Sequence, residues 1–110
     1  MSARQIVYLL LAAVGLVLTW HHNLALVAET GSLDVRNFID GMFANHAAAS
    51  IGWDITVTGV AFLIWVQGES RRLGMRFWGL WVVLTLGVAL AVAAPLFLFA
   101  RERKLAALGA

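Results

Sequence analysis

Residues 47–66 read AAASIGWDITVTGVAFLIWV, and this stretch decides the fold. At about 1.5 Å per residue, a helix of this length covers roughly 30 Å, the thickness of the hydrocarbon core of a membrane. Apolar and polar residues do not alternate with period two, as they do in the strands of membrane barrels. The stretch therefore predicts a membrane-spanning helix, and Asp54 is its one ionisable residue.

Two further apolar stretches flank this one. Residues 5–28 are long enough to span a membrane, although residues 6–19 alone have the length of the apolar part of a signal peptide. We favour the span because Leu26 is bulky where a cleavage site needs a small residue. Residues 77–100 carry no charge and predict a third span, which Pro95 is expected to kink near its end.

The composition of the 110-residue chain agrees with a membrane location. Hydrophobic residues make up 62% and charged residues 13% of the chain, against about 45–50% and about 25% in ordinary soluble domains. A small soluble chain has too much surface to bury that many apolar side chains. The lack of cysteine excludes disulfides, zinc–thiolate sites and iron–sulfur clusters. The basic residues flank the apolar stretches, which gives no indication of nucleic-acid binding.

The connecting segments complete the expected fold. Residues 67–76 predict a short polar turn between the second and third spans. Residues 33–44 predict a short amphipathic helix in the membrane interface. We therefore expect an all-α integral membrane bundle of three transmembrane helices, in a single domain over residues 1–110. The apolar face of the interfacial helix recurs at helical spacing and consists of Val35, Phe38, Ile39, Met42 and Phe43.

Basic residues divide equally between the two sides of such a three-span bundle, so the positive-inside rule does not decide its orientation. Arg4 before the first span favours an amino terminus inside. All the basic residues that follow Arg36 in the sequence, six in number, are expected to anchor the chain at the membrane surface. The alternative for the three arginines of the second loop is that they bind anionic lipid headgroups. One side carries Arg4, Arg71, Arg72 and Arg76, and the other carries Arg36, Arg101, Arg103 and Lys104.

Polar side chains recur every fourth residue along the second span, at His46, Ser50, Asp54 and Thr58. This spacing places them on one face of a helix, with Asp54 about 12 Å deeper than the first of them. An aspartate within a span costs about 2.5–3.5 kcal/mol on insertion scales. We therefore expect Asp54 to face the interior of the bundle, beside a partner.

The Asp54 carboxyl has two interpretations. In the first, it is a general acid, a proton relay or a ligand anchor, with His22 or Asn23 of the first span alongside it and Trp53 lining a pocket. In the second, it makes a hydrogen bond to Thr85, to Asn23 or to a backbone carbonyl that only fixes the packing of the helices.

Three histidines raise the question of a metal or tetrapyrrole site. His22 and His46 would lie on one side of the membrane, where two imidazoles could ligate a haem or one imidazole a chlorophyll. We expect no metal and no tetrapyrrole, because histidines near the ends of spans are ordinary interfacial residues. The five tryptophans likewise predict an aromatic belt, formed by Trp20, Trp53, Trp65, Trp78 and Trp81.

Several short motifs together resemble a bacterial domain-of-unknown-function family. They are Phe43-Ala44-Asn45, the segment ESRRLGMR over residues 69–76 and Pro-Leu-Phe-Leu-Phe at 95–99. The resemblance covers nearly the whole chain and implies a three-helix integral protein of the bacterial cytoplasmic membrane. Members of that family often have proline after Phe-Ala-Asn, where this chain has His46, which implies that His46 is not a ligand throughout the family. The family has no assigned activity.

These observations favour a small accessory subunit, or a binder of a lipid, pigment or isoprenoid, within a larger membrane assembly. Its expected partners are membrane lipids and either a larger membrane protein or further copies of the chain. The alternative is a small intramembrane acid–base enzyme on an isoprenoid-type substrate. Asp54 would then be the acid, and His22 or His46 would relay protons to it.

Overall fold

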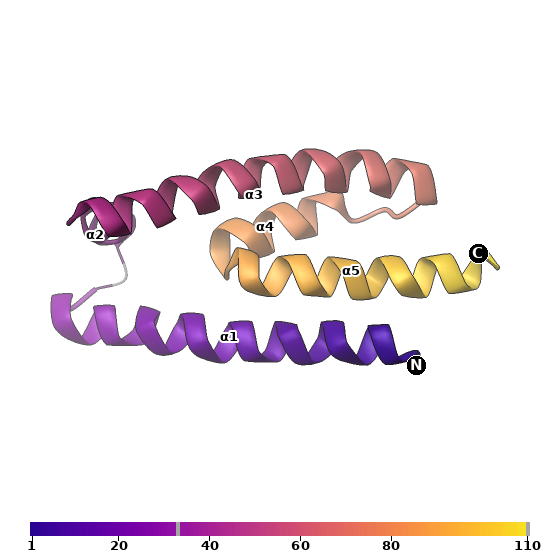
Figure 1. Ribbon diagram of the computed structural model, residues 1–110, viewed down its shortest axis with the longest axis horizontal. Coiled ribbons are helices and arrows are strands. Elements are labelled where there is room, and N and C mark those ends of the chain that lie inside the picture. Colours follow the sequence, from indigo (N-terminus) through magenta and orange to yellow (C-terminus); the bar gives the residue numbers. More distant parts are fainter. Residues whose placement is uncertain (33, 110) are drawn as a thin grey trace.

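The computed structural model describes residues 1–32 and 34–109, which form five α-helices (Figure 1). The prediction of an all-α fold is confirmed. The interfacial helix was predicted from Leu33, which lies outside the described residues, and α2 covers Val35–Met42. The helices are α1 (Ala3–Thr30), α2 (Val35–Met42), α3 (His46–Leu73), α4 (Trp78–Gly87) and α5 (Leu90–Ala107).

Helices α1 and α3 have 28 residues each and are long and apolar enough to cross a membrane. Only 11% of the apolar window of each helix is buried within the molecule, unlike the core helix of a soluble protein. Helix α3 also continues through residues 67–73 of the expected polar turn, and it is capped by Gly74, whose φ of 71° is the left-handed conformation that glycine adopts at helix ends. The turn predicted from residue 67 therefore begins seven residues later, at Gly74.

The prediction of one helix over residues 77–100 is wrong. Figure 1 shows α4 running into the molecule and α5 running back beside it, and we call this pair the hairpin. Gly87 and the β-branched Val88 are poor helix formers, and together they weaken the helix here. The carbonyl of Leu84 accepts hydrogen bonds from the N–H groups of Val88 (3.0 Å) and Ala89 (2.9 Å), which closes α4. Ala89 is fully extended, and the chain then reverses into α5.

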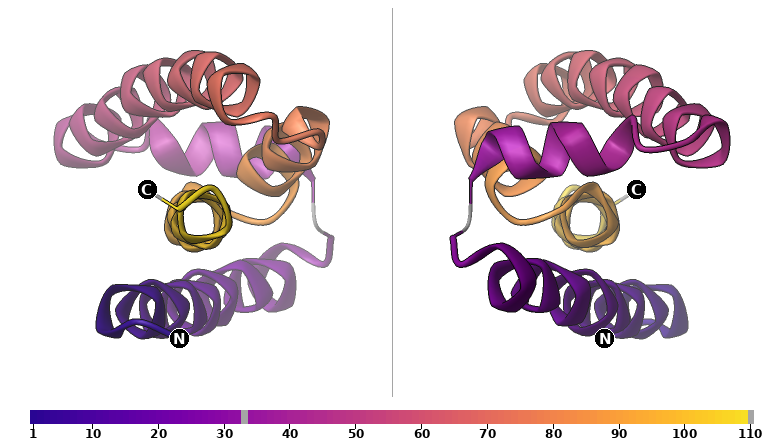
Figure 2. Two further views of the ribbon diagram at one scale, coloured as in Figure 1. Left: turned by 90° about the vertical axis from the view of Figure 1, so that its right-hand side faces the viewer. Right: turned by 90° about the vertical axis from the view of Figure 1, so that its left-hand side faces the viewer.

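Helix α5 is the central element of the molecule. Figures 1 and 2 show it between α1 on one side and α3 with α4 on the other, so that α1 and α3 are separated by it. Pro95, which was expected to kink a third span, lies buried within α5. Because proline has no N–H, the carbonyl of Ala91 lacks its usual partner within the helix.

The hydrophobic core lies where α3, α4 and α5 meet. Phe97 is completely buried, and its ring makes edge contacts with Trp65 and Trp81 at 5.3 Å and with Phe62 at 6.0 Å between centroids. Trp81 and Phe97 stand eight residues before and eight residues after Ala89, so folding back at this point brings them together. Trp81 is 7% exposed, and its predicted place in an aromatic belt is therefore wrong.

The two ends of the molecule differ in composition. Both termini, the end of α3 and the charged part of α5 lie at one end, while α2 lies at the other (Figure 1). We call these the basic end and the α2 end. Of the basic residues, only Arg36 belongs to the α2 end. The basic end carries Arg4, Arg71, Arg72, Arg76, Arg101, Arg103 and Lys104.

Candidate functional site

The polar residues predicted to share one face of α3 do so, but this face points outward. His46, Ser50, Asp54 and Thr58 are all exposed. The expectation that Asp54 faces the bundle interior is wrong. Its proposed partner Thr85 instead donates its hydroxyl to the carbonyl of Trp81 (2.7 Å). In residues 1–32 and 34–109, the Asp54 carboxylate takes part in none of the ion pairs.

The inward face of α3 explains this outcome. The residues Gly52, Gly59, Val66 and Leu73 are all buried and are spaced seven apart, which is close to two turns of helix. Asp54 is two residues, or about 200° of rotation, beyond Gly52 and therefore lies on the opposite side of the helix. Gly52 packs against the side chain of Met42 in α2, and Gly59 lies beside Leu90 at the turn of the hairpin.

Small side chains extend the outward polar face along α3. Ala47 and Ala61 are exposed and fall in line with the polar residues between them. Small residues in such a row let two helix backbones approach closely in a membrane. The row, which we call the outer stripe, consists of Ala47, Ser50, Asp54, Thr58 and Ala61. Large apolar residues flank it, including Ile51 (61% exposed) and Val57 (66% exposed).

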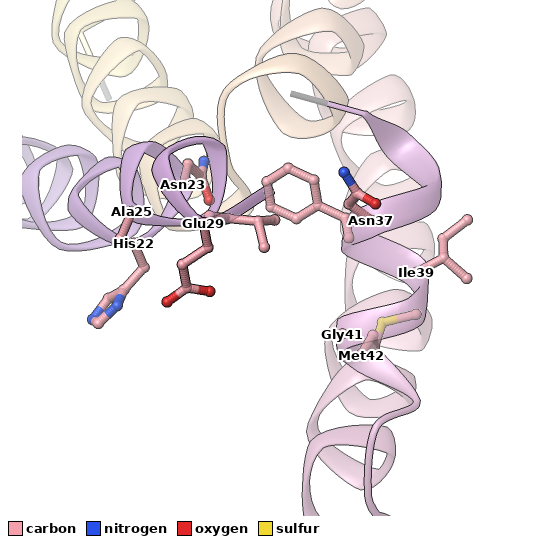
Figure 3. A pocket seen from close by; sticks show the side chains of 10 residues that line it. His22, Asn23, Ala25, Glu29, Asn37, Ile39, Gly41 and Met42 are labelled. Atoms are coloured by element: carbon pink, nitrogen blue, oxygen red, sulfur yellow. The ribbon is translucent and has the colours of Figure 1, made fainter. Parts of the chain in front are cut away.

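His22 and Asn23 do not lie beside the outer stripe. They line a groove of about 510 Å³ between the last turns of α1 and α2 at the α2 end (Figure 3). Glu29 and Asn37 provide further polar groups there, and Phe38 contributes an apolar wall. The groove gathers hydrogen-bonding groups, but Asp54 is not one of its lining residues.

Trp53 and His46 are also placed apart from this groove. Trp53 is 58% exposed on α3 and makes an edge contact with Phe43 at 5.8 Å between ring centroids. His46 is the exposed first residue of α3, and α5 separates its helix from that of His22. No group of three His, Cys, Asp or Glu residues that could hold a metal ion occurs within the described part of the chain.

A second feature of the structure lies at the turn of the hairpin, where α1 packs against backbone carbonyl groups. The indole N–H of Trp20 donates a hydrogen bond to the carbonyl of Val88 (3.1 Å). A Cβ atom on Gly15 would come within 2.6 Å of the carbonyl oxygen of Ala91, so the helix backbones meet here directly. This carbonyl is the one left without a helical partner by Pro95. Helix α1 therefore contacts two of the carbonyl groups at the helix break, those of Val88 and Ala91.

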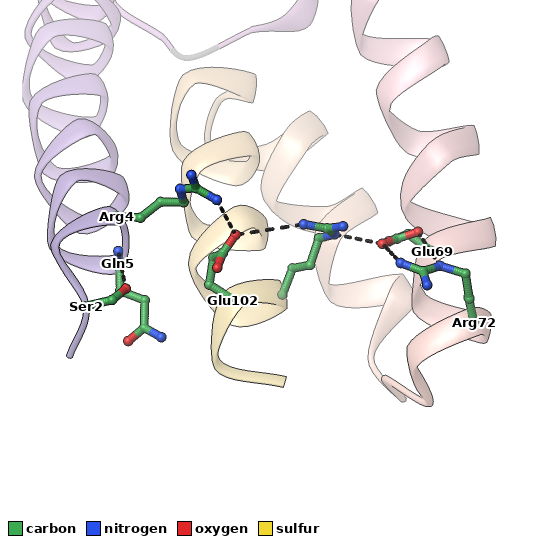
Figure 4. A network of polar contacts seen from close by, with 7 residues as sticks. Ser2, Arg4, Gln5, Glu69, Arg72 and Glu102 are labelled. Carbon is green, nitrogen blue, oxygen red and sulfur yellow. Dashed lines mark hydrogen bonds and ion pairs between the residues drawn. The ribbon is translucent and has the colours of Figure 1, made fainter. Parts of the chain in front are cut away.

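The basic end contains a network of ion pairs that joins three helices (Figure 4). Glu69 of α3 accepts hydrogen bonds from Arg72 on the same helix and from Arg101 of α5 (2.7 Å). The Oε1 atom of Glu102 in α5 lies 3.7 Å from Nη1 of Arg4 in α1 and 3.8 Å from Nη1 of Arg101. The network holds three of the seven basic residues at this end against two carboxylates.

The Glu69 carboxylate is the ionisable group most affected by its surroundings. It lies beyond the apolar stretch 47–66, at the polar end of α3. Hydrogen bonds from Arg72 and Arg101, with their positive charge, lower its pKa from 4.5 to about 2, although burial acts in the opposite direction. Glu69 is therefore ionised at any physiological pH and acts as a fixed link between α3 and α5.

The remaining basic residues predicted to anchor the chain are separate from this network. Arg71 is exposed on α3. Arg76, Arg103 and Lys104 line a second groove, of about 490 Å³, between the start of α4 and the last turns of α5. Nothing in the local sequence pattern brought these three together, because the reversal at Ala89 was not predicted.

Comparison with known proteins identifies a family but no characterised relative. A family model described as "Protein of unknown function DUF2834" matches residues 7–103. No curated protein and no solved structure matches the chain. The match covers the two long helices, α2 and the hairpin.

Proposed function

The chain belongs to the DUF2834 family, and we propose that it is a membrane-embedded accessory subunit that docks a larger membrane protein through the outer stripe of α3. The observation that supports this proposal most strongly is the position of Asp54. Its carboxyl is exposed on the outer stripe, midway along an otherwise apolar membrane-spanning stretch. Leaving it against lipid would cost about 2.5–3.5 kcal/mol on insertion scales, so a partner at this depth is favoured.

The arrangement in the membrane is part of this proposal. Helices α1 and α3 would each cross the bilayer of a bacterial cytoplasmic membrane, and the hairpin would enter and leave from the basic end. Helix α4 has 10 residues, or about 15 Å, which is half the thickness of the hydrocarbon core. Helical breaks occur at membrane depth only where protein covers the free backbone groups, and α1 contacts two such groups here, the carbonyls of Val88 and Ala91.

The distribution of charge supports this arrangement. A three-span bundle divides the basic residues four to four, whereas the hairpin places seven at one end and Arg36 alone at the other. Cytoplasmic segments of membrane proteins carry an excess of lysine and arginine. We therefore propose that the basic end, with both termini, is cytoplasmic.

The outer stripe also has the shape of a helix-docking face. Ala47 and Ala61 allow close approach, and Ser50 and Thr58 provide hydroxyl groups one turn on either side of Asp54. The complementary surface is a transmembrane helix with a lysine, an arginine or a hydrogen-bond donor at the depth of Asp54. A second copy of the chain fits less well, because pairing the same stripe about a two-fold axis would place two carboxyls together.

The observed geometry does not favour the alternative of an acid–base enzyme. Such chemistry needs the acid and its proton relay within hydrogen-bond reach in a site that excludes water. Asp54 lies on the outer side of α3, and His22 lies in the groove between α1 and α2. We therefore propose no reaction for this chain.

The proposal predicts that Asp54→Leu releases the chain from its complex. After mild detergent extraction from the native membrane, the wild type should migrate as one discrete complex larger than a dimer of the chain. Asp54→Leu should migrate alone, because the new side chain suits lipid, while Asp54→Glu should retain the complex. Size-exclusion chromatography with light scattering measures these masses. A lone wild-type chain, a homodimer, or a complex that survives Asp54→Leu would each contradict the proposal.

A further inference from the structure

The groove at the basic end, which we call the basic groove, combines a concentrated positive charge with apolar walls. Its polar lining consists of three cationic side chains from two separate segments, Arg76 before α4 and Arg103 and Lys104 near the end of α5. None of its lining residues is acidic. The site therefore has a concentrated positive charge that its own walls do not compensate.

These three cations differ from the other basic residues at the same end. Arg72 and Arg101 are bound to Glu69, and Arg4 lies beside Glu102. None of the basic-groove cations takes part in an ion pair within residues 1–32 and 34–109. The carboxylates at this end are thus used to join helices, and the basic groove retains its charge.

The other walls of the basic groove are apolar. Phe77 is 72% exposed and Leu80 is 49% exposed, and both line the groove with Met75 and Trp81. A site for a free phosphate ion would not need exposed apolar side chains. A molecule with an anionic group and a hydrocarbon chain matches both kinds of wall.

The position of the basic groove fits the same kind of molecule. The cations on α5 follow directly after its apolar residues, which end at Ala100, and Arg76 directly precedes the apolar residues of α4. In the proposed arrangement these positions lie at the level of the lipid headgroups, with the apolar wall extending below them. Basic pockets between helices on the cytoplasmic side are known to bind anionic lipid headgroups.

We infer that the basic groove binds an anionic phospholipid, with its phosphodiester between Arg76, Arg103 and Lys104 and an acyl chain along Phe77 and Leu80. The lipid would fill the space between the hairpin's two helices on the cytoplasmic side. This inference rests on the proposed membrane arrangement but not on docking through the outer stripe. The Asp54→Leu variant should therefore retain the lipid even when it loses the partner.

Native mass spectrometry tests the inference on the intact chain. The protein is purified into detergent, supplied with equal amounts of phosphatidylglycerol and phosphatidylcholine, and scored for lipid that remains bound. The wild type should retain one phosphatidylglycerol in preference to phosphatidylcholine. Inorganic phosphate or glycerol phosphate at millimolar concentration should not displace it, because neither reaches the apolar wall.

Two double variants separate a defined site from general attraction between charges. Arg76→Gln with Arg103→Gln removes two charges from the basic groove and should weaken retention of phosphatidylglycerol on the order of 30-fold. Arg36→Gln with Arg71→Gln removes two charges elsewhere and should leave retention unchanged. Equal losses in both variants, equal retention of the two lipids, or displacement by inorganic phosphate would each overturn the inference.

Discussion

At the scale of single residues, the fold depends on how α1 protects the reversal of the chain. Gly15 has no side chain, so the backbone of α1 can approach the carbonyl of Ala91 that Pro95 leaves without a partner. Trp20, five residues further along α1, then donates a hydrogen bond to the carbonyl of Val88. In a membrane, where water does not satisfy such groups, each of these contacts has more weight than in a soluble protein.

Gly15→Ala should destabilise the protein by about 1–3 kcal/mol, because the new methyl group would overlap the backbone of Ala91. Gly68→Ala is the matched control, since that helical position faces open space. It should stabilise the protein by about 0.4–1 kcal/mol through its effect on the unfolded chain. Thermal unfolding in one detergent should thus show opposite shifts, and shifts of the same sign would contradict the packing of α1 on α5.

Trp20→Phe should cost about 1–3 kcal/mol, because it leaves the partly buried carbonyl of Val88 without its hydrogen-bond donor. Trp53→Phe makes the same chemical change at an exposed position and should have little effect on unfolding. The comparison uses the same unfolding measurement. If the two variants unfold alike, the indole of Trp20 does not support the helix break.

At the scale of elements, α5 connects the two halves of the molecule. It packs along α1 on one face and meets α3 and α4 on the other (Figure 2). Glu69 and Glu102 add charged links at the basic end. Because these links cross between helices, they fix the position of α5 along its length as well as its distance from its neighbours.

The Glu69 link predicts a loss of stability in acid. The pKa of Glu69 is about 2 in the folded protein and 4.5 without these contacts. Its stabilising effect is therefore fully present above about pH 4.5 and is lost as the pH falls toward 2. The midpoint of thermal unfolding should fall between pH 6 and pH 3, and Glu69→Gln should reduce that fall. Glu29→Gln, an exposed carboxylate at the α2 end, should behave as the wild type, and an identical fall in all three proteins would contradict the link.

Much at this scale was predictable from the amino-acid sequence, but the hairpin was not. The long apolar runs gave α1 and α3, and the amphipathic spacing gave α2. Hydropathy does not reveal the reversal at Ala89, because residues 77–100 are apolar whether they form one helix or two. Two weak signals of the reversal are present in the sequence. Gly87 is followed by Val88, and Trp81 and Phe97 lie at equal distances from the turn.

The face of α3 could also have been predicted. The spacing of the polar residues predicted that they share one face of α3. The free-energy cost of an aspartate within a membrane span then favoured an inward position for Asp54. The small residues Gly52 and Gly59, in register with Val66 and Leu73, give the opposite orientation and agree with the structure. The rule that intramembrane carboxylates face protein does not say that the protein must be the same chain.

At the scale of the whole molecule, the account depends on the direction in which the last helix runs. The molecule is 49 Å long, so its ends would extend beyond a hydrocarbon core of about 30 Å. The hairpin returns the carboxyl terminus to the end that holds the amino terminus (Figure 1). That return gathers the basic residues, forms the basic groove and leaves the outer stripe on the surface.

Single-cysteine labelling tests this direction, and the chain has no cysteine of its own to remove. Ser2→Cys, Ser32→Cys and Leu108→Cys place one thiol before α1, one before α2 and one after α5, all at exposed positions. A membrane-impermeant maleimide is applied to intact cells and then to lysed cells. Labelling of Ser32→Cys in intact cells, with Ser2→Cys and Leu108→Cys labelled only after lysis, is the predicted result. Labelling of Leu108→Cys together with Ser32→Cys in intact cells would show three spans and contradict the hairpin.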